Sequence, residues 1–252
     1  MTSQQLLSPL RRAIDTYKMI KEGDHIAVGL SGGKDSIALL TLLAHLKRFY
    51  PKHFELMAIN IDLGYDYDKT QVENMKAYCE KLCVPLIIEK TEIGKLLFEV
   101  RKETNPCSLC SNLRRGALNS IAIKNGCNKL ALGHHADDLV ETFFLSMLYE
   151  GRFSTFEPVT YLSRTGMTVI RPMIFIEEKN LIAFSKDLPV IFNPCPANKQ
   201  TKRQYVKELI ASIKNDVPIA KQRILAAIYN PDRNHLFDDA VKKLEEQGYF
   251  DE

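Results

Sequence analysis

The sequence predicts an α/β fold in which helices cover both faces of a doubly wound, mostly parallel five-stranded sheet. Short apolar runs of strand length alternate with longer segments in which apolar residues recur at helical spacing. The first apolar run ends in a glycine-containing turn that leads directly into such a helical segment. No internal repeat, low-complexity tract or flexible linker interrupts this alternation. A chain of 252 residues therefore suits one large domain with modest extensions.

The elements follow one another in a regular order. Strands are expected at residues 25–30, 56–61, 86–89, 129–133 and 168–171, where the apolar runs are short. Helices are expected at residues 36–49, 67–82, 113–125, 137–149, 178–186 and 203–214. We divide the chain into a helical N-terminal extension at residues 1–22, a central domain at 23–216 and a helical C-terminal tail at 217–252, which Pro231 breaks.

The turn after the first strand has the sequence Ser31-Gly32-Gly33-Lys34-Asp35-Ser36. Its two glycines let the backbone approach a ligand closely, and the helix that follows directs free N–H groups and the positive end of its dipole at the turn. Lys34 adds a full positive charge, and Ser31 and Ser36 add hydroxyl donors. The Walker and dinucleotide-binding glycine patterns are both absent. The turn therefore predicts a phosphate site of another kind, at the carboxyl edge of the sheet where doubly wound folds bind ligands.

Two other strands also end in polar residues at this edge. The second strand ends in Asn60-Ile61-Asp62, and the fourth leads through Gly133 into His134-His135-Ala136-Asp137-Asp138 and a helix. Aspartates in the first turn of a helix are a common N-terminal device, which accounts for one of the pair. Beside a nucleotide, Asp137 and Asp138 are candidate Mg²⁺ ligands, because this ion prefers hard oxygen donors.

Six cysteines in a chain with no visible secretory signal indicate metal or sulfur chemistry rather than a disulfide framework. Cys107 and Cys110 form a C-x-x-C pair, which is typical of a metal or redox site. A zinc site normally has four ligands, whereas three thiolates can hold an iron–sulfur cluster and leave one iron open. The other cysteines before residue 130 are expected to be small core residues: Cys79, Cys83 and Cys127.

Charge and hydropathy limit which partners and which location the sequence allows. The net charge of +3 is too small to indicate nucleic-acid binding by itself. The basic residues are clustered, however, and each cluster is either a solvated face or a contact surface: Arg11, Arg12, Lys18 and Lys21, and later Lys199, Lys202, Arg203 and Lys207. The longest apolar stretch, residues 37–46, is too short to span a bilayer. We expect a cytoplasmic protein with no membrane partner.

Five motifs together resemble the tRNA 2-thiocytidine synthetase family, which belongs to the PP-loop, or N-type ATP pyrophosphatase, superfamily. They are the phosphate turn, P-C-S-L-C-S-N-L-R-R-G at residues 106–116, L-G-H-H-A-D-D-L-V-E-T at 132–142, Arg171-Pro172 and Asn193-Pro194-Cys195. The resemblance extends from about residue 10 to residue 215 and implies the PP-loop ATPase fold, which is similar to adenine nucleotide α-hydrolases.

The resemblance also implies an activity. Members of the family use ATP to adenylate the C2 oxygen of an anticodon-loop cytidine in tRNA. Sulfur from a cysteine desulfurase then replaces this oxygen. By motif match, a [4Fe-4S] cluster would be held by Cys107, Cys110 and Cys195, while Lys34, Asp137 and Asp138 would be catalytic, the two aspartates with Mg²⁺. A homodimer is expected.

The remaining residues divide into two groups. Those expected to bind ATP are Ser31, Gly32, Gly33, Lys34, Asp35, Ser36, Asn60, Asp62, Gly133, His134 and Arg171. Those expected to contact tRNA, as basic side chains beside an unstacked loop base, are Arg114, Arg115, Lys199, Lys202 and Arg203.

Other interpretations stay open at this point. The family often has a second C-x-x-C where this chain has Cys195 followed by Pro196-Ala197-Asn198. In a second interpretation the cysteines cycle through a persulfide and a disulfide, a route that leaves Cys195 without a role. In a third, the acceptor is another nucleobase or a small molecule. A nucleotide-binding redox sensor without turnover and a zinc-stapled RNA-binding module are the two non-thiolating alternatives.

Overall fold

A computed structural model describes residues 2–65, 67–101, 106–192, 195, 202–230 and 246. The chain divides into two compact units, Met1–Gln204 and Tyr205–Glu252. The first unit holds the sheet and every predicted site residue. The second unit begins inside helix α8 (Lys202–Asp216) and contains α9 (Ala220–Tyr229). The predicted break at Pro231 lies outside the described residues.

The first unit is built on a six-stranded sheet with the order β3-β2-β1-β4-β6-β5. Five neighbouring strands are parallel, and β5 runs antiparallel to β6 at the edge. The strands are β1 (Asp24–Gly29), β2 (Phe54–Asp62), β3 (Leu86–Lys90), β4 (Lys129–Ala131), β5 (Val159–Leu162) and β6 (Met167–Ile170). The strand order reverses at β1, so a crevice at the carboxyl ends of β1 and β4 is expected.

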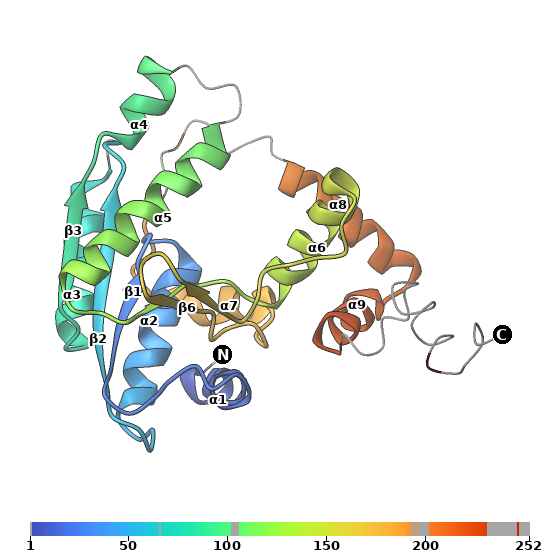
Figure 1. The fold of residues 1–252 in the computed structure, drawn as a ribbon, viewed down its shortest axis with the longest axis horizontal. Helices are drawn as coiled ribbons and strands as arrows, with labels where there is room; N and C mark the ends of the chain where they lie inside the picture. The colour runs from blue at the N-terminus through green and yellow to red at the C-terminus, as the bar shows by residue number, and fades with distance from the viewer. Residues whose placement is uncertain are drawn as a thin grey trace. The chain divides into compact units, whose positions relative to one another are not determined.

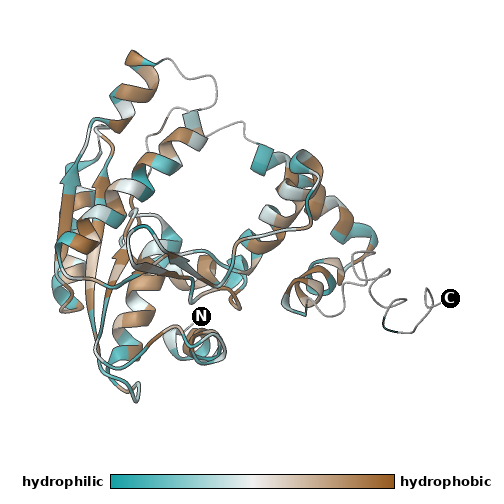
Figure 2. Ribbon diagram, viewed as in Figure 1, coloured by the Kyte–Doolittle hydropathy of each residue, from teal (hydrophilic) through white to brown (hydrophobic). Residues whose placement is uncertain are grey.

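Helices cover both faces of the sheet, as Figure 1 shows. On one face, Leu118 and Ala122 of α5 (Pro106–Lys124) pack against Ala27, Ile59 and Leu130. Strand side chains alternate in direction, so the neighbours of these residues point to the opposite face, where α2 (Lys34–Lys47) contacts β1 and β2. The apolar residues therefore concentrate along the strands and the helices that sandwich them (Figure 2).

The predicted N-terminal extension is the helix α1 (Ser3–Thr16), and its apolar side packs on α2. Leu6, Leu10, Ala13 and Ile14 are all fully buried there. Because α1 covers the side of α2 that the sheet leaves open, α2 is buried around most of its circumference. The remaining helices of the first unit are α3 (Lys69–Lys81), α4 (Ile93–Lys95), α6 (Ala136–Glu150) and α7 (Glu178–Phe184).

The predicted α/β fold is confirmed, with differences of detail. The sheet has a sixth strand, β5, which the sequence did not indicate because this short edge strand is only half buried and lacks a strong apolar pattern. Two short helical turns follow the ends of α4 and α7: a π-helix at Leu96–Val100 and a 3-10 helix at Ser185–Asp187. Helix α5 begins seven residues before the predicted start, at Pro106, so the C-x-x-C pair lies in its first turns.

The expectation for the three structural cysteines is correct for two of them. Cys79 and Cys127 are buried, whereas Cys83 is exposed. Helix α3 ends at Lys81, and Cys83 takes a left-handed conformation with φ of 55° in the turn that follows. The helical spacing of Cys79 and Cys83 suggested one buried face, but the helix stops before the second cysteine.

A buried ion pair joins β1 to β4 at the amino edge of the sheet. Lys129 Nζ lies 2.7 Å from Asp24 Oδ2, and both side chains are less than a tenth exposed. Burial raises the pKa of Asp24, but hydrogen bonds from Lys129, the Lys21 backbone and Asn128 outweigh it, so the pKa lies below its usual value. Lys129 also donates to the carbonyl oxygen of Met19. The pair therefore fixes the start of both strands beside the chain that leaves α1.

In the part of the chain that the structure describes, no helix is both long enough and apolar enough to cross a membrane.

Replacing Lys129 by methionine is expected to reduce the free energy of unfolding by about 3–5 kcal/mol, because Asp24 is left buried without its counter-ion. Urea denaturation at neutral pH measures the change. Adding Asp24→Asn should restore most of the loss, and a double variant as unstable as the single one would contradict the explanation. Because the pKa of Asp24 is lowered, the contribution of the pair is complete above about pH 4 and is lost as the pH falls through the folded-state pKa.

Candidate active site

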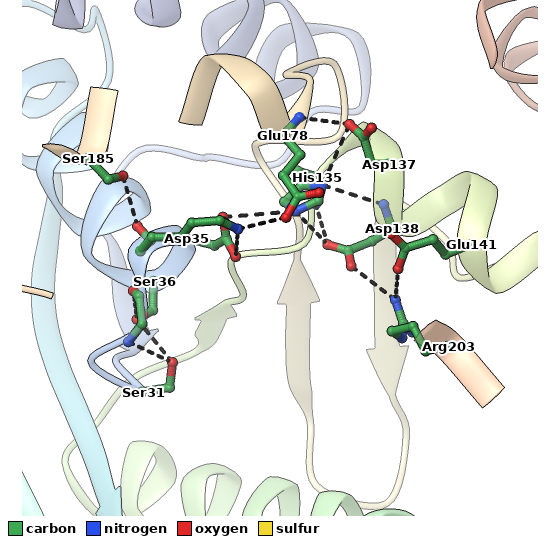
Figure 3. A network of polar contacts seen from close by, with 12 residues as sticks. Ser31, Asp35, Ser36, His135, Asp137, Asp138, Glu141, Glu178, Ser185 and Arg203 are labelled. Carbon is green, nitrogen blue, oxygen red and sulfur yellow. Dashed lines mark hydrogen bonds and ion pairs between the residues drawn. The ribbon is translucent and has the colours of Figure 1, made fainter. Parts of the chain in front are cut away.

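The turn from Ser31 to Ser36 joins the carboxyl end of β1 to the first turn of α2. Gly32 has a φ of 82°, which a glycine adopts without strain, and Gly33 is the N-cap of α2 and has no side chain to cap it. The turn is braced from inside: Ser36 Oγ donates to the Gly33 carbonyl at 2.9 Å and accepts from Ser31 Oγ at 3.1 Å (Figure 3). The uncapped N–H groups at the start of α2 are thus available to an anion.

Gly133, at the end of β4, lies directly against the first turn of α2. A Cβ at this position would stand 3.1 Å from the backbone C and O of Asp35 and 3.2 Å from the backbone N of Ser36. Since all three neighbours are backbone atoms, no flexible side chain can move aside. The absence of a side chain at Gly133 therefore sets how closely β4 approaches the phosphate turn.

Lys34 lies between two carboxylates. Its Nζ atom is 2.9 Å from Glu178 Oε1 and 3.0 Å from both carboxylate oxygens of Asp35. Burial lowers the pKa of Lys34, but the hydrogen bonds to Glu178 and Asp35 more than offset this, so the pKa lies above its usual value. Lys34 is therefore charged and already oriented at the mouth of the turn. Glu178 was not predicted: it is the first residue of α7, 144 positions away in the chain.

The two aspartates that follow the histidines have different partners. Asp138 closes a capping box at the start of α6: its Oδ2 accepts from the backbone N of His135, whose Nδ1 accepts from the backbone N of Asp138. Asp137 Oδ2 accepts from the first N–H of α7, that of Glu178, at 2.7 Å. One aspartate thus caps its own helix and the other holds α7 in place, both within the network of Figure 3.

Arg203 completes this network from the start of α8. Its Nη1 lies 3.0 Å from Asp138 Oδ1 and 2.8 Å from Oε2 of Glu141, whose side chain is 4% exposed. The sequence placed Arg203 among the tRNA contacts. In the structure its guanidinium faces two carboxylates of α6, and the expected tRNA contact stays a prediction.

His134 and Arg171 both lie close to the ring of Phe156. The His134 ring is 4.9 Å from that of Phe156, and the Arg171 guanidinium lies over the same ring at 5.2 Å. His134 Nδ1 and Arg171 Nε are buried and have no hydrogen-bond partner among the residues that the structure describes. Burial lowers the pKa of His134 to about 4 and that of Arg171 to about 10. His134 is therefore neutral at physiological pH, with a ring nitrogen free for a ligand.

Asn60 and Asp62 end β2 at the same edge, as expected, but both side chains bind backbone. Asn60 Nδ2 donates to the Leu30 carbonyl at 2.7 Å, and Asp62 Oδ1 accepts from the Gly64 N–H at 2.9 Å. Asn60 therefore fixes the residue that precedes the phosphate turn. Both side chains therefore stabilise the backbone beside the ligand site.

A cavity of about 430 Å³ opens beside the turn, within the range of small-molecule sites. Its floor is apolar and its polar walls come from three directions: the phosphate turn, the His134–Asp138 segment and Arg114 and Arg115 of α5. The apolar lining consists of Leu30, Ile59, Ile61, Leu63, Tyr67, Leu118 and Leu132. A flat base and a charged phosphate chain fit such a combination.

The first turns of α5 carry the cysteine pair next to this cavity. Cys110 is buried in an apolar cluster with Leu63, Ile93 and Leu97, while Cys107 is exposed. Burial raises the pKa of Cys110; Arg114 opposes this rise and the sulfurs of Cys195 and Cys107 add to it.

Cys195 lies close to the pair although it is 85 residues further along the chain than Cys110. Tyr65, which packs against the cluster around Cys110, donates its hydroxyl hydrogen to Cys195 Sγ at 3.8 Å. The structure therefore brings together the three predicted thiols.

The chemistry of these thiols fits an iron–sulfur cluster. Among the described residues, no three histidine, cysteine or acidic side chains are close enough to hold a single metal ion. A cluster places several irons between its thiolates and is held by soft sulfur ligands in apolar surroundings. Three thiols beside an apolar cluster meet that requirement.

The other basic residues expected to contact tRNA lie in three different surroundings. Arg114 and Arg115 line the cavity, and within the described part of the chain the buried Arg114 Nε has no hydrogen-bond partner. Lys202 Nζ lies 4.4 Å from the centre of the Tyr149 ring. Lys199 lies outside the described residues.

Comparison with known proteins agrees with this arrangement. The PP-loop domain family matches residues 4–213. Among curated relatives, the tRNA-cytidine(32) 2-sulfurtransferase of Syntrophotalea carbinolica is 38% identical over 92% of this chain and 90% of its own. That of Pelobacter propionicus is 36% identical over 96% of this chain and 91% of its own.

A solved structure is also similar. The U34-tRNA thiolase NcsA from Methanococcus maripaludis, determined with its [4Fe-4S] cluster, superimposes with a TM-score of 0.71 and 25% identity, over 91% of this chain and 78% of that one.

The fold and the phosphate turn thus define a PP-loop protein. Within that class, the chain belongs to the tRNA-cytidine(32) 2-sulfurtransferase family and is a transferase.

Replacing Gly133 by alanine is expected to weaken binding of a non-hydrolysable ATP analogue at least tenfold and to cost about 1–3 kcal/mol of stability, because the new methyl group pushes β4 away from α2. Isothermal calorimetry and urea denaturation measure the two effects. Gly116→Ala is the matched control, because its Cβ meets nothing within 4 Å. Unchanged affinity in Gly133→Ala would show that this close approach does not shape the site.

His134 is expected to titrate near pH 4 in an NMR experiment, far below the ordinary value of about 6.5. Between these two values the unfolded chain binds a proton that the folded chain does not. His134 therefore lowers stability as the pH falls through this window and has no such effect above it. His134→Gln should make the stability profile flatter there, whereas replacing the exposed His53 should not. A midpoint near 6.5 would refute the burial argument.

Proposed function

We propose that this chain converts a cytidine of the tRNA anticodon loop, cytidine 32, to 2-thiocytidine. AMP from ATP is attached to the C2 oxygen with release of pyrophosphate, and sulfur then replaces that oxygen as AMP leaves. The observation that supports this best is a cavity that borders both the phosphate turn and the cysteine-bearing helix α5. The names of the relatives supply the acceptor.

The phosphate turn serves the ATP half of the reaction. Lys34 and the N–H groups of α2 stabilise the negative charge that develops as pyrophosphate leaves. Asp138 lines the cavity, so we assign Mg²⁺ to it in preference to Asp137. Its two oxygens accept from His135 N and Arg203, and these contacts would be shared with the ion. Bound Mg²⁺ would neutralise phosphate charge.

The cysteines serve the sulfur half. Cys107, Cys110 and Cys195 would hold a [4Fe-4S] cluster, which when bound would present the sulfur atom that is transferred. The apolar cluster around Cys110 keeps water away from this end of the cavity. A cysteine desulfurase is the expected source of the sulfur.

The acceptor base enters from the side of the basic residues. Neutral His134 offers a buried ring nitrogen to the base, and the Arg171 guanidinium lies over the neighbouring Phe156 ring. Arg114 and Arg115 line the cavity, where they can meet the flanking phosphates, with Lys199 and Lys202 as further contacts. We expect the active form to be a homodimer.

The test combines three measurements on protein purified without oxygen: iron and acid-labile sulfide content, pyrophosphate release, and 2-thiocytidine in tRNA by mass spectrometry. We expect about four irons per chain, and ATP-dependent thiolation that requires a sulfur donor. Cys107→Ala should lose both iron and thiolation, while the exposed Cys83→Ser should lose neither. Lys34→Ala should retain iron and lose at least 100-fold in pyrophosphate release.

Each failure has its own meaning. Thiolation by iron-free protein would exclude the cluster and favour the mechanism in which the cysteine pair carries a persulfide. Pyrophosphate release that tRNA does not stimulate, but a free nucleoside does, would exclude tRNA as the acceptor.

A further inference from the structure

Glu178 lies beside the phosphate turn although it belongs to α7, a helix that the sequence did not connect with the site. Its Oε1 atom accepts from Lys34 Nζ at 2.9 Å, and its side chain is 23% exposed, so this contact is partly shielded from water. Asp35, the second carboxylate bonded to Lys34, lines the cavity. Lys34 therefore stands at the edge of the cavity, beside the turn where the phosphates of a nucleotide are expected.

The chain that leads into α7 is fixed to the start of α6. The Ala136 N–H donates to the Ile176 carbonyl at 2.9 Å. Two residues later, the Glu178 N–H donates to Asp137 Oδ2 at 2.7 Å (Figure 3). The backbone of Glu178 therefore has a fixed place relative to α6, and from there its side chain reaches across to α2.

The other end of α7 is attached to the phosphate turn. The buried Ser185 directly follows the helix, and its hydroxyl donates to the Lys34 carbonyl at 3.4 Å. The chain continues, described throughout, to Ile191, whose N–H donates to the Gly32 carbonyl at 2.8 Å. The segment that begins at Glu178 thus meets Lys34 twice, once at the side chain and once at the backbone.

We propose that Glu178 is a positioning residue for ATP cleavage, which holds the ammonium group of Lys34 at the phosphate turn from a place set by α6 and α7. A long lysine side chain otherwise samples many rotamers. Its ammonium group has three hydrogens, so a phosphate oxygen that takes one still leaves one for each carboxylate. The functional meaning of this contact rests on the proposed function, because only there does Lys34 act on ATP. The contact itself does not.

The charges indicate that Glu178 serves turnover and not affinity. A negative charge beside a phosphate site opposes the binding of a nucleotide. The same charge favours the protonated lysine: burial lowers the pKa of Lys34, and the hydrogen bonds to Glu178 and Asp35 outweigh that effect. One further titratable group lies near, His135, whose Nε2 is 3.8 Å from Asp35 Oδ1. Glu178 thus gives up some attraction for ATP and keeps a charged, oriented lysine for the step in which pyrophosphate leaves.

The first measurement is the pH profile of Lys34 acetylation in the full chain without nucleotide or tRNA, by trace labelling with acetic anhydride and peptide mass spectrometry. Only the unprotonated amine reacts. Glu178→Gln should therefore raise the Lys34 rate about threefold or more near about pH 8 and move the profile to lower pH. Exposed Lys214 is the reference within each sample. Glu177→Gln removes the neighbouring carboxylate, which lies 3.2 Å from Lys179, and should leave the Lys34 profile in place.

The second measurement is the rate of pyrophosphate release as a function of ATP concentration. Glu178→Gln should lower kcat about tenfold or more, because the charge of Lys34 is no longer held in place. The KM for ATP should stay equal or fall, because a negative charge has been removed. If the unaltered chain releases no pyrophosphate, the proposed function fails, and the acetylation profile still decides whether Glu178 holds Lys34.

Three results would overturn the proposal. One is a Lys34 profile that Glu178→Gln leaves unchanged. Another is a raised KM for ATP with an unchanged kcat, which would limit Glu178 to binding. The third is a higher Mg²⁺ requirement with an unchanged Lys34 profile, which would make Glu178 a metal ligand. If Glu178→Gln fails to fold, Glu178→Asp keeps the charge on a shorter side chain, and it should still lower kcat without raising KM.

Discussion

The close approach of β4 to α2 is the constraint on which the site depends. Gly133 has no side chain, so the end of β4 lies against the backbone of Asp35 and Ser36. The chain then turns directly into α6, which brings the carboxylates of Asp137 and Asp138 beside the phosphate turn. A larger residue at position 133 would move the phosphate turn and the α6 carboxylates apart along the carboxyl edge of the sheet. The doubly wound topology brings the strand ends to one edge of the sheet, and the contact of Gly133 with α2 joins the residues at that edge into one site.

Charge in the site is arranged in opposed pairs. Lys34 lies between Asp35 and Glu178, and Arg203 lies between Asp138 and Glu141. A nucleotide that binds here exchanges one set of anionic oxygens around Lys34 for another. The net gain from charge attraction is therefore smaller than an unpaired lysine would give. In return, the lysine is held in one orientation before the ligand arrives, so less side-chain entropy is lost on binding.

The sequence was sufficient for the parts of the fold and site that depend on local pattern. Alternating apolar runs predicted the parallel strands, and the positions of Gly32, Gly33 and the His134–Asp138 segment followed from strand ends. Contacts between distant residues were not predictable: Glu178 reaches Lys34 across 144 positions, and nothing around it marks it as special. Three further features also depend on where segments end in space. They are the hydrogen bonds of Asn60 and Asp62 to backbone groups, the edge strand β5 and the exposure of Cys83.

Helix α5 is anchored in the sheet by Leu118 and Ala122 and carries its thiols at the other end. Cys110 precedes Leu118 by eight residues, which is about 12 Å along a rigid rod. A helix turns about 100° per residue, so one residue inserted or deleted between them would swing the cysteines round the axis and away from Cys195. The number of residues between Leu118 and the thiols thus fixes the direction in which the thiols point from the helix axis. An inserted or deleted residue can be accommodated in a loop of this chain, but not along this stretch of helix.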